Sequence, residues 1–401
     1  MNRRASGAEP GGHNDRQRFP LGSTLLLVSV FFMTFLARTI LSPLLLPIER
    51  DLGVTHAEAG SFFLIISIGL IATMLGSGFV SQRLNHHRMI ALSVAVSGAG
   101  ALLLGASTTL AGFRAGLVLL GAGAGLYLPS GLTTLTDVVP SRQWGRALAI
   151  HELGPILGLF SGPILAELAL RVGGWRSVLI AIGAISLVMA VVFARWGAGG
   201  RFHGAPPHWS ALREVVASRR FWIIAFFFVM AIGLELGVYA MLPTYLVVDR
   251  GLDQSLVNTI VSTSRLTSLL AVFAAGWLSD RFGVRHVIGG VAVTAGLVTA
   301  VLGFAGGWLL IAAVYLQPML ISSFFPAGLT ALAGVGSAER RNLAVSVVVP
   351  LAYLFGAGMI PAILGHLAEV NLFGTGFIGV GVLMIVGALL VGGLRERPRE
   401  G

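Results

Sequence analysis

The sequence predicts an all-α membrane protein with twelve transmembrane helices, and three observations carry this prediction. Of the 401 residues, 55% are hydrophobic and only 11% are charged, whereas an average soluble domain has about 25% charged residues. The hydrophobic residues fall into runs of roughly 20, the length that a helix needs to cross a hydrocarbon core. The runs lack the two-residue alternation of barrel strands, and lipid offers no partners to backbone N–H and C=O groups. Each run is therefore expected to be one spanning helix.

Charged, glycine and proline residues mark the breaks between the runs. The predicted spans are 23–46, 60–81, 89–108, 112–136, 147–169, 175–194, 221–247, 256–279, 287–304, 308–333, 343–367 and 373–394. The longest polar break, 195–220, is rich in glycine and proline and is expected to be a linker. The predicted organisation is an N-terminal tail (1–22), a six-helix half (23–194), a linker (195–220), a second six-helix half (221–394) and a C-terminal tail (395–401).

The basic residues, all 27 of them arginines, lie mainly between the spans. Twenty fall on the side that holds both termini: Arg3, Arg4, Arg16, Arg18, Arg83, Arg88, Arg142, Arg146, Arg195, Arg201, Arg213, Arg219, Arg220, Arg281, Arg285, Arg340, Arg341, Arg395, Arg397 and Arg399. The other side holds four: Arg50, Arg171, Arg176 and Arg250. This positive-inside asymmetry predicts a multi-pass protein of the cell membrane with both termini in the cytoplasm. The net charge of +10 thus reflects topology, and nucleic acid is not an expected partner.

The two halves contain an internal repeat. The segment PSGLTTL at 129–135 returns as PAGLTAL at 326–332, and GFVSQR at 78–83 returns as GWLSDR at 276–281. The offsets of 197 and 198 residues agree closely. Two halves repeated in the same topological sense, with a binding site between them, are typical of one class of secondary transporter.

The second copy of this loop, GWLSDRFGVR at 276–285, resembles the cytosolic loop signature of the major facilitator superfamily. The resemblance extends over essentially the whole chain and implies a major facilitator fold that works by alternating access. It implies a cytosolic gate at Gly276, Asp280, Arg281, Gly283 and Arg285, in which the acid and the arginines pair with each other and with helix ends. The alternative is a solvated loop that merely follows the positive-inside rule.

The first copy of the loop contributes Gly78 and Arg83 to the same predicted gate. It departs from the pattern, because Gln82 stands where the acid is expected and Asn85 where the second glycine is expected. A weaker latch is therefore expected in the first half.

Ionisable residues inside the spans are the strongest candidates for function, because each is costly in lipid unless it faces a partner or a wet cavity. Arg38 is predicted to lie about 12 Å from the outer end of its helix and Arg265 about 14 Å, at 1.5 Å per residue. Arginine can hold a carboxylate bidentately, so the pair is predicted to bind an anionic substrate. The alternative is that one or both neutralise Glu235 in the seventh span.

Glu235 is the carboxylate nearest to the middle of a span. Burial favours its neutral form and a nearby arginine favours its charged form, which makes it a candidate proton carrier. A fixed counter-ion is the alternative. Gln317, Tyr239, Tyr315 and Tyr353 are predicted to supply hydrogen bonds to substrate, or else to neighbouring helices.

We therefore predict a monomeric transporter that moves a small organic anion, a carboxylate, together with protons. No cofactor or metal is expected, because cysteine is absent and no metal-ligand spacing or phosphate-binding loop is found. The same test finds no enzyme site. A proton-driven exporter of amphipathic drugs is one alternative, favoured by the GPILGLFSGP segment at 154–163 and by the 23 phenylalanines; pairing of Arg265 with Glu235 would favour it. A non-transporting receptor or sensor on the same fold is the other.

Overall fold

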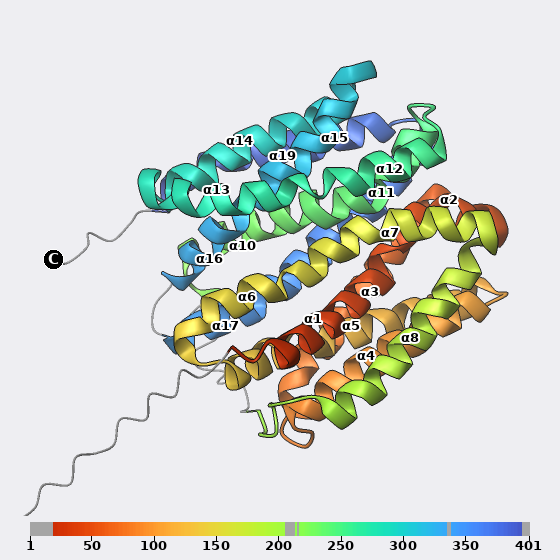
Figure 1. The fold of residues 1–401 in the computed structure, drawn as a ribbon. Coiled ribbons are helices and arrows are strands. Elements are labelled where there is room, and N and C mark those ends of the chain that lie inside the picture. The colour runs from red at the N-terminus through yellow and green to blue at the C-terminus, as the bar shows by residue number, and fades with distance from the viewer. Residues whose placement is uncertain (1–18, 205–212, 215, 335–337, 395–401) are drawn as a thin grey trace, which may run out of the picture.

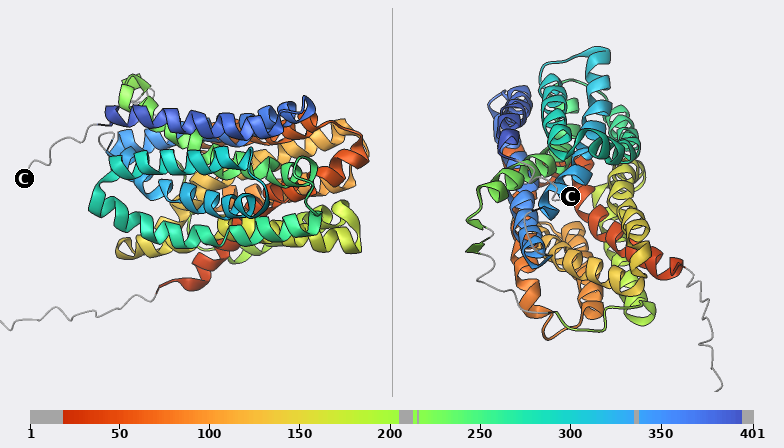
Figure 2. Two further views of the ribbon diagram at one scale, coloured as in Figure 1. Left: turned by 90° about the horizontal axis from the view of Figure 1, so that it is seen from above. Right: turned by 90° about the vertical axis from the view of Figure 1, so that its left-hand side faces the viewer.

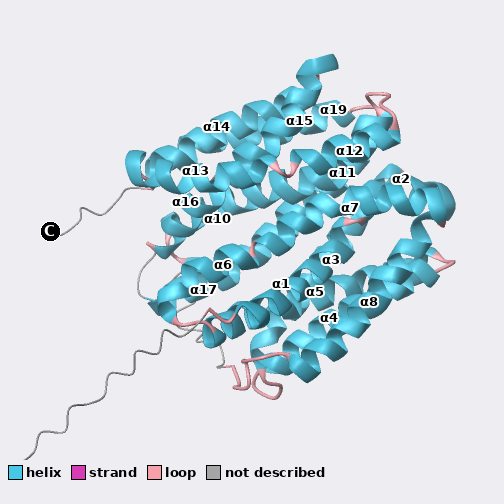
Figure 3. Cartoon of the chain, viewed as in Figure 1, coloured by secondary structure: helices cyan, strands magenta, loops and turns pink. Residues whose placement is uncertain are grey.

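The computed structural model describes residues 19–204, 213–214, 216–334 and 338–394. In these ranges every regular element is a helix and no strand is present (Figure 3). The predicted all-α fold is confirmed.

The first six spans form one half of the molecule and run from red to yellow-green in Figure 1. They comprise α1 (Leu21–Thr39), α2 (Leu41–Leu52), α3 (His56–Val80), α4 (His86–Ala106), α5 (Leu110–Val138), the short η1 (Ser141–Gln143), α6 (Trp144–His151), α7 (Leu153–Val172) and α8 (Gly174–Trp196).

The last six spans form the other half, coloured green to blue in Figure 1. They comprise α10 (Arg219–Ile232), η2 (Gly233–Gly237), α11 (Val238–Val248), α12 (Gln254–Ser264), α13 (Thr267–Phe282), α14 (Val284–Leu302), α15 (Gly307–Ser322), α16 (Phe324–Ala333), α17 (Ala338–Leu351), η3 (Ala352–Met359), α18 (Ile360–Glu369), α19 (Phe373–Gly387) and η4 (Ala388–Gly393).

The twelve predicted spans correspond in order to these helices or to consecutive helical segments. Among the described residues, eleven continuous helices are long and apolar enough to cross a membrane. The remaining predicted span, 256–279, is made of α12 and α13, which have 11 and 16 residues. A turn at Arg265 and Leu266 separates them, so neither segment alone reaches the length of a span.

Short polar side chains define where several helices begin. Thr55 and Glu58 form a capping box at the start of α3, with the Thr55 side chain accepting from the Glu58 N–H. Thr109 and Asp253 accept from the first amides of α5 and α12 in the same way. These bonds satisfy backbone donors that have no partner within the helix.

The start of α1 and the dark-blue end of the last helix lie at the same end of the bundle in the left view of Figure 2. We call this end the terminal face and the other the opposite face. The positive-inside asymmetry predicts that the terminal face is cytoplasmic.

The two halves approach each other most closely along α3 and α18. A Cβ atom on Gly60 would overlap the carbonyl oxygen of Pro361, and one on Gly365 would overlap that of His56. Deeper in the bundle, a Cβ on Gly358 would lie 2.8 Å from the Cβ of Ser67. Lipid supplies no hydrophobic force between helices, so small residues that permit close backbone packing are the expected means of association.

Hydrogen bonds between the halves also gather toward the opposite face. The Asn258 side chain donates to Glu167 at 2.9 Å, and the Ala57 N–H donates to Glu369 at 3.0 Å. Arg171 donates to Ser255 across the same boundary at 3.2 Å. Between residues 19–204 and 216–394, no hydrogen bond of the described side chains joins the halves near the terminal face. The hydrogen bonds of described side chains between the halves therefore lie toward the opposite face and at the level of the pocket.

Because α3 packs closely against α18, we predict that alanine is more destabilising at Gly365 than at Gly290. Gly365→Ala should lower the free energy of unfolding by about 1–3 kcal/mol, because its Cβ meets backbone atoms that cannot rotate away. Gly290→Ala is the matched control, because Gly290 lies on α14 with nothing near its Cβ. It should be neutral or stabilising by up to about 1 kcal/mol. Thermal unfolding in detergent micelles measures both, and equal melting temperatures would contradict the proposed contact.

Candidate functional site

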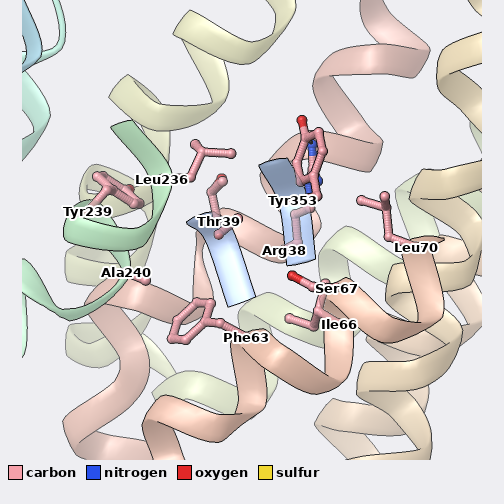
Figure 4. A pocket seen from close by; sticks show the side chains of 11 residues that line it. Arg38, Thr39, Phe63, Ile66, Ser67, Leu70, Leu236, Tyr239, Ala240 and Tyr353 are labelled. Atoms are coloured by element: carbon pink, nitrogen blue, oxygen red, sulfur yellow. Dashed lines mark hydrogen bonds between the residues drawn. The ribbon is translucent and has the colours of Figure 1, made fainter. Parts of the chain in front are cut away.

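A pocket lies between the two halves, deep in the bundle (Figure 4). Its cavity volume is about 40 Å³, and it is partly open to solvent. The first half contributes α1 and α3, and the second contributes η2, α11 and η3. The lining residues are Arg38, Thr39, Phe63, Ile66, Ser67, Leu70, Leu236, Tyr239, Ala240, Tyr353 and Ala357. The wall is thus mainly apolar with one cation.

Arg38 is held in place by aromatic rings. Its guanidinium carbon lies 4.4 Å from the ring centre of Phe35 and 5.0 Å from that of Tyr353. Its Nη2 donates to the Tyr353 hydroxyl at 3.3 Å, while its Nε is buried without a hydrogen-bond partner. Within the described part of the chain, no carboxylate lies within ion-pair distance of Arg38. The guanidinium is a half-buried cation without a counter-ion.

A second, smaller chamber shares Arg38, Leu70 and Tyr353 with the first. Its remaining lining residues are Phe31, Thr34, Met74, Ala124 and Leu128. All five come from the first half. Arg38 therefore stands at the junction of two spaces with apolar walls.

Arg265 lies in a different environment from Arg38. It is 1% exposed, follows directly on α12, and has its Nη1 3.5 Å from Oε1 of Glu235. Its guanidinium carbon lies 4.7 Å from the ring centre of Tyr239. None of its three side-chain nitrogens makes a hydrogen bond to a described residue. The charge of Arg265 is thus balanced by Glu235.

Tyr239 lies between the two arginines. Its ring contacts Arg265 and also lines the pocket next to Arg38, whereas Arg265 itself does not line it. The Tyr239 carbonyl accepts from Ser42 of the first half at 2.7 Å, and its hydroxyl donates to the carbonyl of Leu159 at 3.4 Å. Both the backbone and the side chain of Tyr239 therefore bond to the first half of the molecule.

The other predicted side chains bind neighbouring helices in this conformation. Gln317 is buried and donates to the carbonyl of Leu234 at 2.8 Å. The Tyr315 hydroxyl lies 2.6 Å from that of Thr263, and Ser322 donates to Glu235 at 3.4 Å. Of the residues predicted to bind substrate, Arg38, Tyr239 and Tyr353 line the pocket, whereas Arg265, Gln317 and Tyr315 do not.

Two π-helical segments occupy the middle of the seventh and eleventh spans, and the sequence analysis missed them. In η2 the Val238 N–H bonds to the carbonyl of Gly233, and in η3 the Ile360 N–H bonds to that of Phe355, five residues back in each case. Glu235 lies on η2 and Tyr353 on η3. Such segments are rare and frequent at functional sites, but no short sequence pattern identifies them.

The predicted cytosolic gate residues lie at the terminal ends of the spans. Asp280, Arg281 and Arg285 are exposed, and the guanidinium of Arg281 lies 5.2 Å from the ring of Trp277. Gly276 lies within α13 and Gly283 ends it with φ at +82°, a conformation that favours glycine. No ion pair of Asp280 with a described residue is formed in this conformation.

The first-half loop lies at the corresponding position in the repeat, but a different residue begins its next helix. Asn85 stands where the second-half loop has a glycine, and the φ of Asn85 is −65°. The Asn85 side chain caps α4 by accepting from the Arg88 N–H at 2.9 Å. Gln82 donates back to the carbonyl of Gly78 at 3.2 Å, and Arg83 is exposed. The departure from the repeat thus substitutes a helix cap for a glycine turn.

Comparison with known proteins gives a consistent result. The family model described as Major Facilitator Superfamily matches residues 27–264 and 237–401. The 4-hydroxybenzoate transporter PcaK of Pseudomonas aeruginosa is 24% identical over 82% of this chain and 81% of its own length. The probable sulfoacetate transporter SauU of Cupriavidus necator is 25% identical over 90% of each chain.

The name of a third relative indicates a different role. The putative multidrug resistance protein MdtD of Yersinia pestis is 25% identical over 80% of this chain and 66% of its own length. Among solved structures, a bacterial homologue of the human lysosomal transporter Spinster, in an inward-facing and unoccupied conformation, aligns with a TM-score of 0.81 at 15% identity. The alignment covers 95% of this chain and 99% of that chain, which supports the fold alone.

The burial of the Arg265–Glu235 pair predicts that the two charges cannot be removed singly without loss of stability. Glu235→Ala should lower the free energy of unfolding by about 3–5 kcal/mol, because Arg265 would remain buried without a counter-charge. The double variant Glu235→Leu with Arg265→Met should recover most of that loss. Chemical or thermal unfolding in micelles measures both. A single variant within 1 kcal/mol of wild type would contradict the pairing.

Proposed function

The chain belongs to the major facilitator superfamily, and from this premise we propose that it moves a small organic anion, a carboxylate, across the cytoplasmic membrane together with protons. Family membership and the named relatives identify it as a multi-pass membrane transporter rather than an enzyme. The substrate class, the coupling ion, the orientation and a monomeric state belong to the proposal.

The observation that carries the anion proposal is the unpaired guanidinium of Arg38. A cation in a membrane interior is costly unless it is paired or solvated, and here its polar and ring contacts with described residues are those to Phe35 and to the ring and hydroxyl of Tyr353. Arginine remains charged at any relevant pH and suits the planar fork of a carboxylate. A bound carboxylate would supply the missing counter-charge.

The walls of the pocket support an organic rather than an inorganic anion. Phe63, Ile66, Leu70 and Leu236 surround the space beside Arg38. Small-molecule sites are typically apolar with a few polar groups that fix orientation. Ser67 and the Tyr353 hydroxyl are the nearest such groups in this pocket. The printed substrates of two relatives, 4-hydroxybenzoate and sulfoacetate, are organic acids as well.

Glu235 is the group that we propose for proton coupling. Glu235 pairs with Arg265 and accepts a hydrogen bond from Ser322. The guanidinium of Arg265 also lies over the ring of Tyr239. Protonation of Glu235 would neutralise its carboxylate, so the net charge of the Glu235–Arg265 pair would change when a proton binds. Inward movement of protons could then be linked to movement of an anion.

Alternating access would use the two faces differently. The seam of α3 and α18 and the bonds between α7 and α12 hold the opposite face together. In the other conformation these contacts would part, and the exposed Asp280, Arg281 and Arg285 of the gate would pair near the terminal face. The terminal face is then cytoplasmic, with both chain ends on that side.

The drug exporter remains the second candidate, because one specific observation favours it. Arg265 is paired with Glu235, so only one of the two predicted cations is free to bind an anion. The printed role of MdtD is of the same kind. Extrusion of an amphipathic cation against inward protons would need Glu235 but not Arg38.

Uptake into proteoliposomes separates the two functions. With an inward proton gradient, wild type should take up at least one labelled acid from a panel of benzoate, 4-hydroxybenzoate, acetate and sulfoacetate. Arg38→Gln should reduce that uptake about 10- to 100-fold, because a hydrogen-bonded charge contributes about 1.5–3 kcal/mol.

The matched control is Arg114→Gln, because Arg114 is an exposed arginine that pairs with Glu58 far from the pocket. It should leave uptake unchanged. Uptake that survives Arg38→Gln would exclude Arg38 as the group that binds the anion. Absence of uptake for every acid, together with proton-driven extrusion of a cationic dye, would exclude the anion function and support the exporter.

A further inference from the structure

The two π-helical segments are packed directly against one another. A Cβ atom on Gly356 of η3 would lie 2.7 Å from the backbone nitrogen of Gly233 and 2.5 Å from the carbonyl oxygen of Val229. A Cβ on Gly237 would overlap the carbonyl oxygen of Gly356. The backbones of η2 and η3 therefore approach each other closely at three glycines, Gly233, Gly237 and Gly356, and the Ile360 side chain packs beside the contact.

The η2 segment carries one residue of the ion pair and one residue that lines the pocket. The η3 segment carries two residues that line the pocket, one of which binds Arg38. On η2, Glu235 pairs with Arg265, while its neighbour Leu236 lines the pocket. On η3, Tyr353 binds Arg38 and Ala357 lines the pocket. A continuous path of backbone contact thus leads from Glu235 to the ring and hydroxyl that hold Arg38.

Exchange of the five-residue hydrogen bonds of a π segment for the four-residue bonds of an α-helix would change the direction of the side chains that the segment carries. Coupling through η2 and η3 would require such an exchange in both segments. Coupling between two sites requires such an element with discrete arrangements whose equilibrium both sites bias. Glycines at the contact allow one backbone to follow the other without a steric barrier.

We propose that the contact between η2 and η3 couples the charge of Glu235 to anion binding at Arg38, with Gly356 as the positioning residue. This inference rests on the proposed function for the identity of the two sites. It adds the physical route between them, which runs through backbone packing rather than through the side chain of Tyr239.

The charged and titratable groups around this route belong to four elements or junctions. Glu235 is faced by Arg265 at the end of α12, whose guanidinium also lies over the ring of Tyr239 on α11, and it accepts from Ser322 on α15. Tyr353 is faced by Arg38 on α1. No other ionisable side chain of the described residues makes a hydrogen bond or ion pair with Glu235 or Tyr353.

Hydrogen exchange detected by mass spectrometry tests the route without a ligand, using full-length protein in micelles. E235Q removes the charge while keeping an amide in its place. It should change the exchange rate of the 352–359 amides at least threefold relative to wild type. In a Gly356→Ala background the same E235Q substitution should change those amides less than 1.5-fold.

The matched control is Gly379→Ala, because Gly379 lies on α19 with nothing near its Cβ. In that background the response to E235Q should remain threefold. Gly233→Ala is a milder variant, because its Cβ meets the movable end of the Ile360 side chain. It replaces Gly356→Ala if that protein does not fold, and should give an intermediate response.

Binding of benzoate at pH 6 and pH 8 gives the second measurement. The ratio of the two dissociation constants should fall toward 1 in Gly356→Ala and in E235Q, but not in Gly379→Ala. Benzoate is used here as a probe of anion binding, and the exchange experiment remains decisive if benzoate does not bind.

The outcomes separate the inference from the proposed function. An unchanged response to E235Q in folded Gly356→Ala protein overturns the route, even if Arg38 binds anions. No response of the 352–359 amides to E235Q in wild type also overturns it. Failure of every acid to be transported, together with a response that depends on Gly356, would overturn the anion function alone and leave the route in place.

Discussion

Lipid offers neither hydrogen-bond partners to a backbone nor counter-ions to a charge, and the rest of this structure depends on that constraint. It requires every span to be a helix and every buried charge to have a reason. Arg265 has Glu235 as its counter-ion. Arg38 has aromatic rings and a hydroxyl, and no carboxylate among the described residues. The difference between two arginines at similar depth is therefore the main clue to what the pocket binds.

Close backbone packing is the second consequence of the same constraint. Since helices in lipid gain nothing from burying apolar surface against each other, contact must come from shape and hydrogen bonds. Gly60 and Gly365 bring α3 and α18 together toward the opposite face, and Gly233 and Gly356 bring η2 and η3 together beside the pocket. Gly365 of the first contact and Gly356 of the second both lie along the eleventh span, which gives that span a part in both the proposed closure and the proposed coupling.

The spans, their number and the repeat could be predicted from the sequence, because hydrophobic runs and their polar breaks are set by the thickness of the bilayer. The similar depth of Arg38 and Arg265 is a prediction from the same count. Their different environments could not be predicted, because the direction in which a side chain points depends on helix rotation and on breaks such as the one at Arg265. Phe35 and Phe63 were missed as partners of the site for the same reason, since aromatic residues are common in every span. The π segments leave no pattern that could be recognised in one sequence.

The pairing of Arg265 with Glu235 bears on both candidate functions, and its position argues for a role in coupling rather than in binding. A buried ion pair contributes little net stability compared with apolar residues of the same size, so its presence in a span needs another reason. Arg265 packs against the ring of Tyr239 and does not line the pocket. A proton on Glu235 would leave Arg265 uncompensated beside that ring. Under the proposed function the pair would respond to protonation while Arg38 would bind the anion, and one site of each kind is the minimum that coupled transport requires.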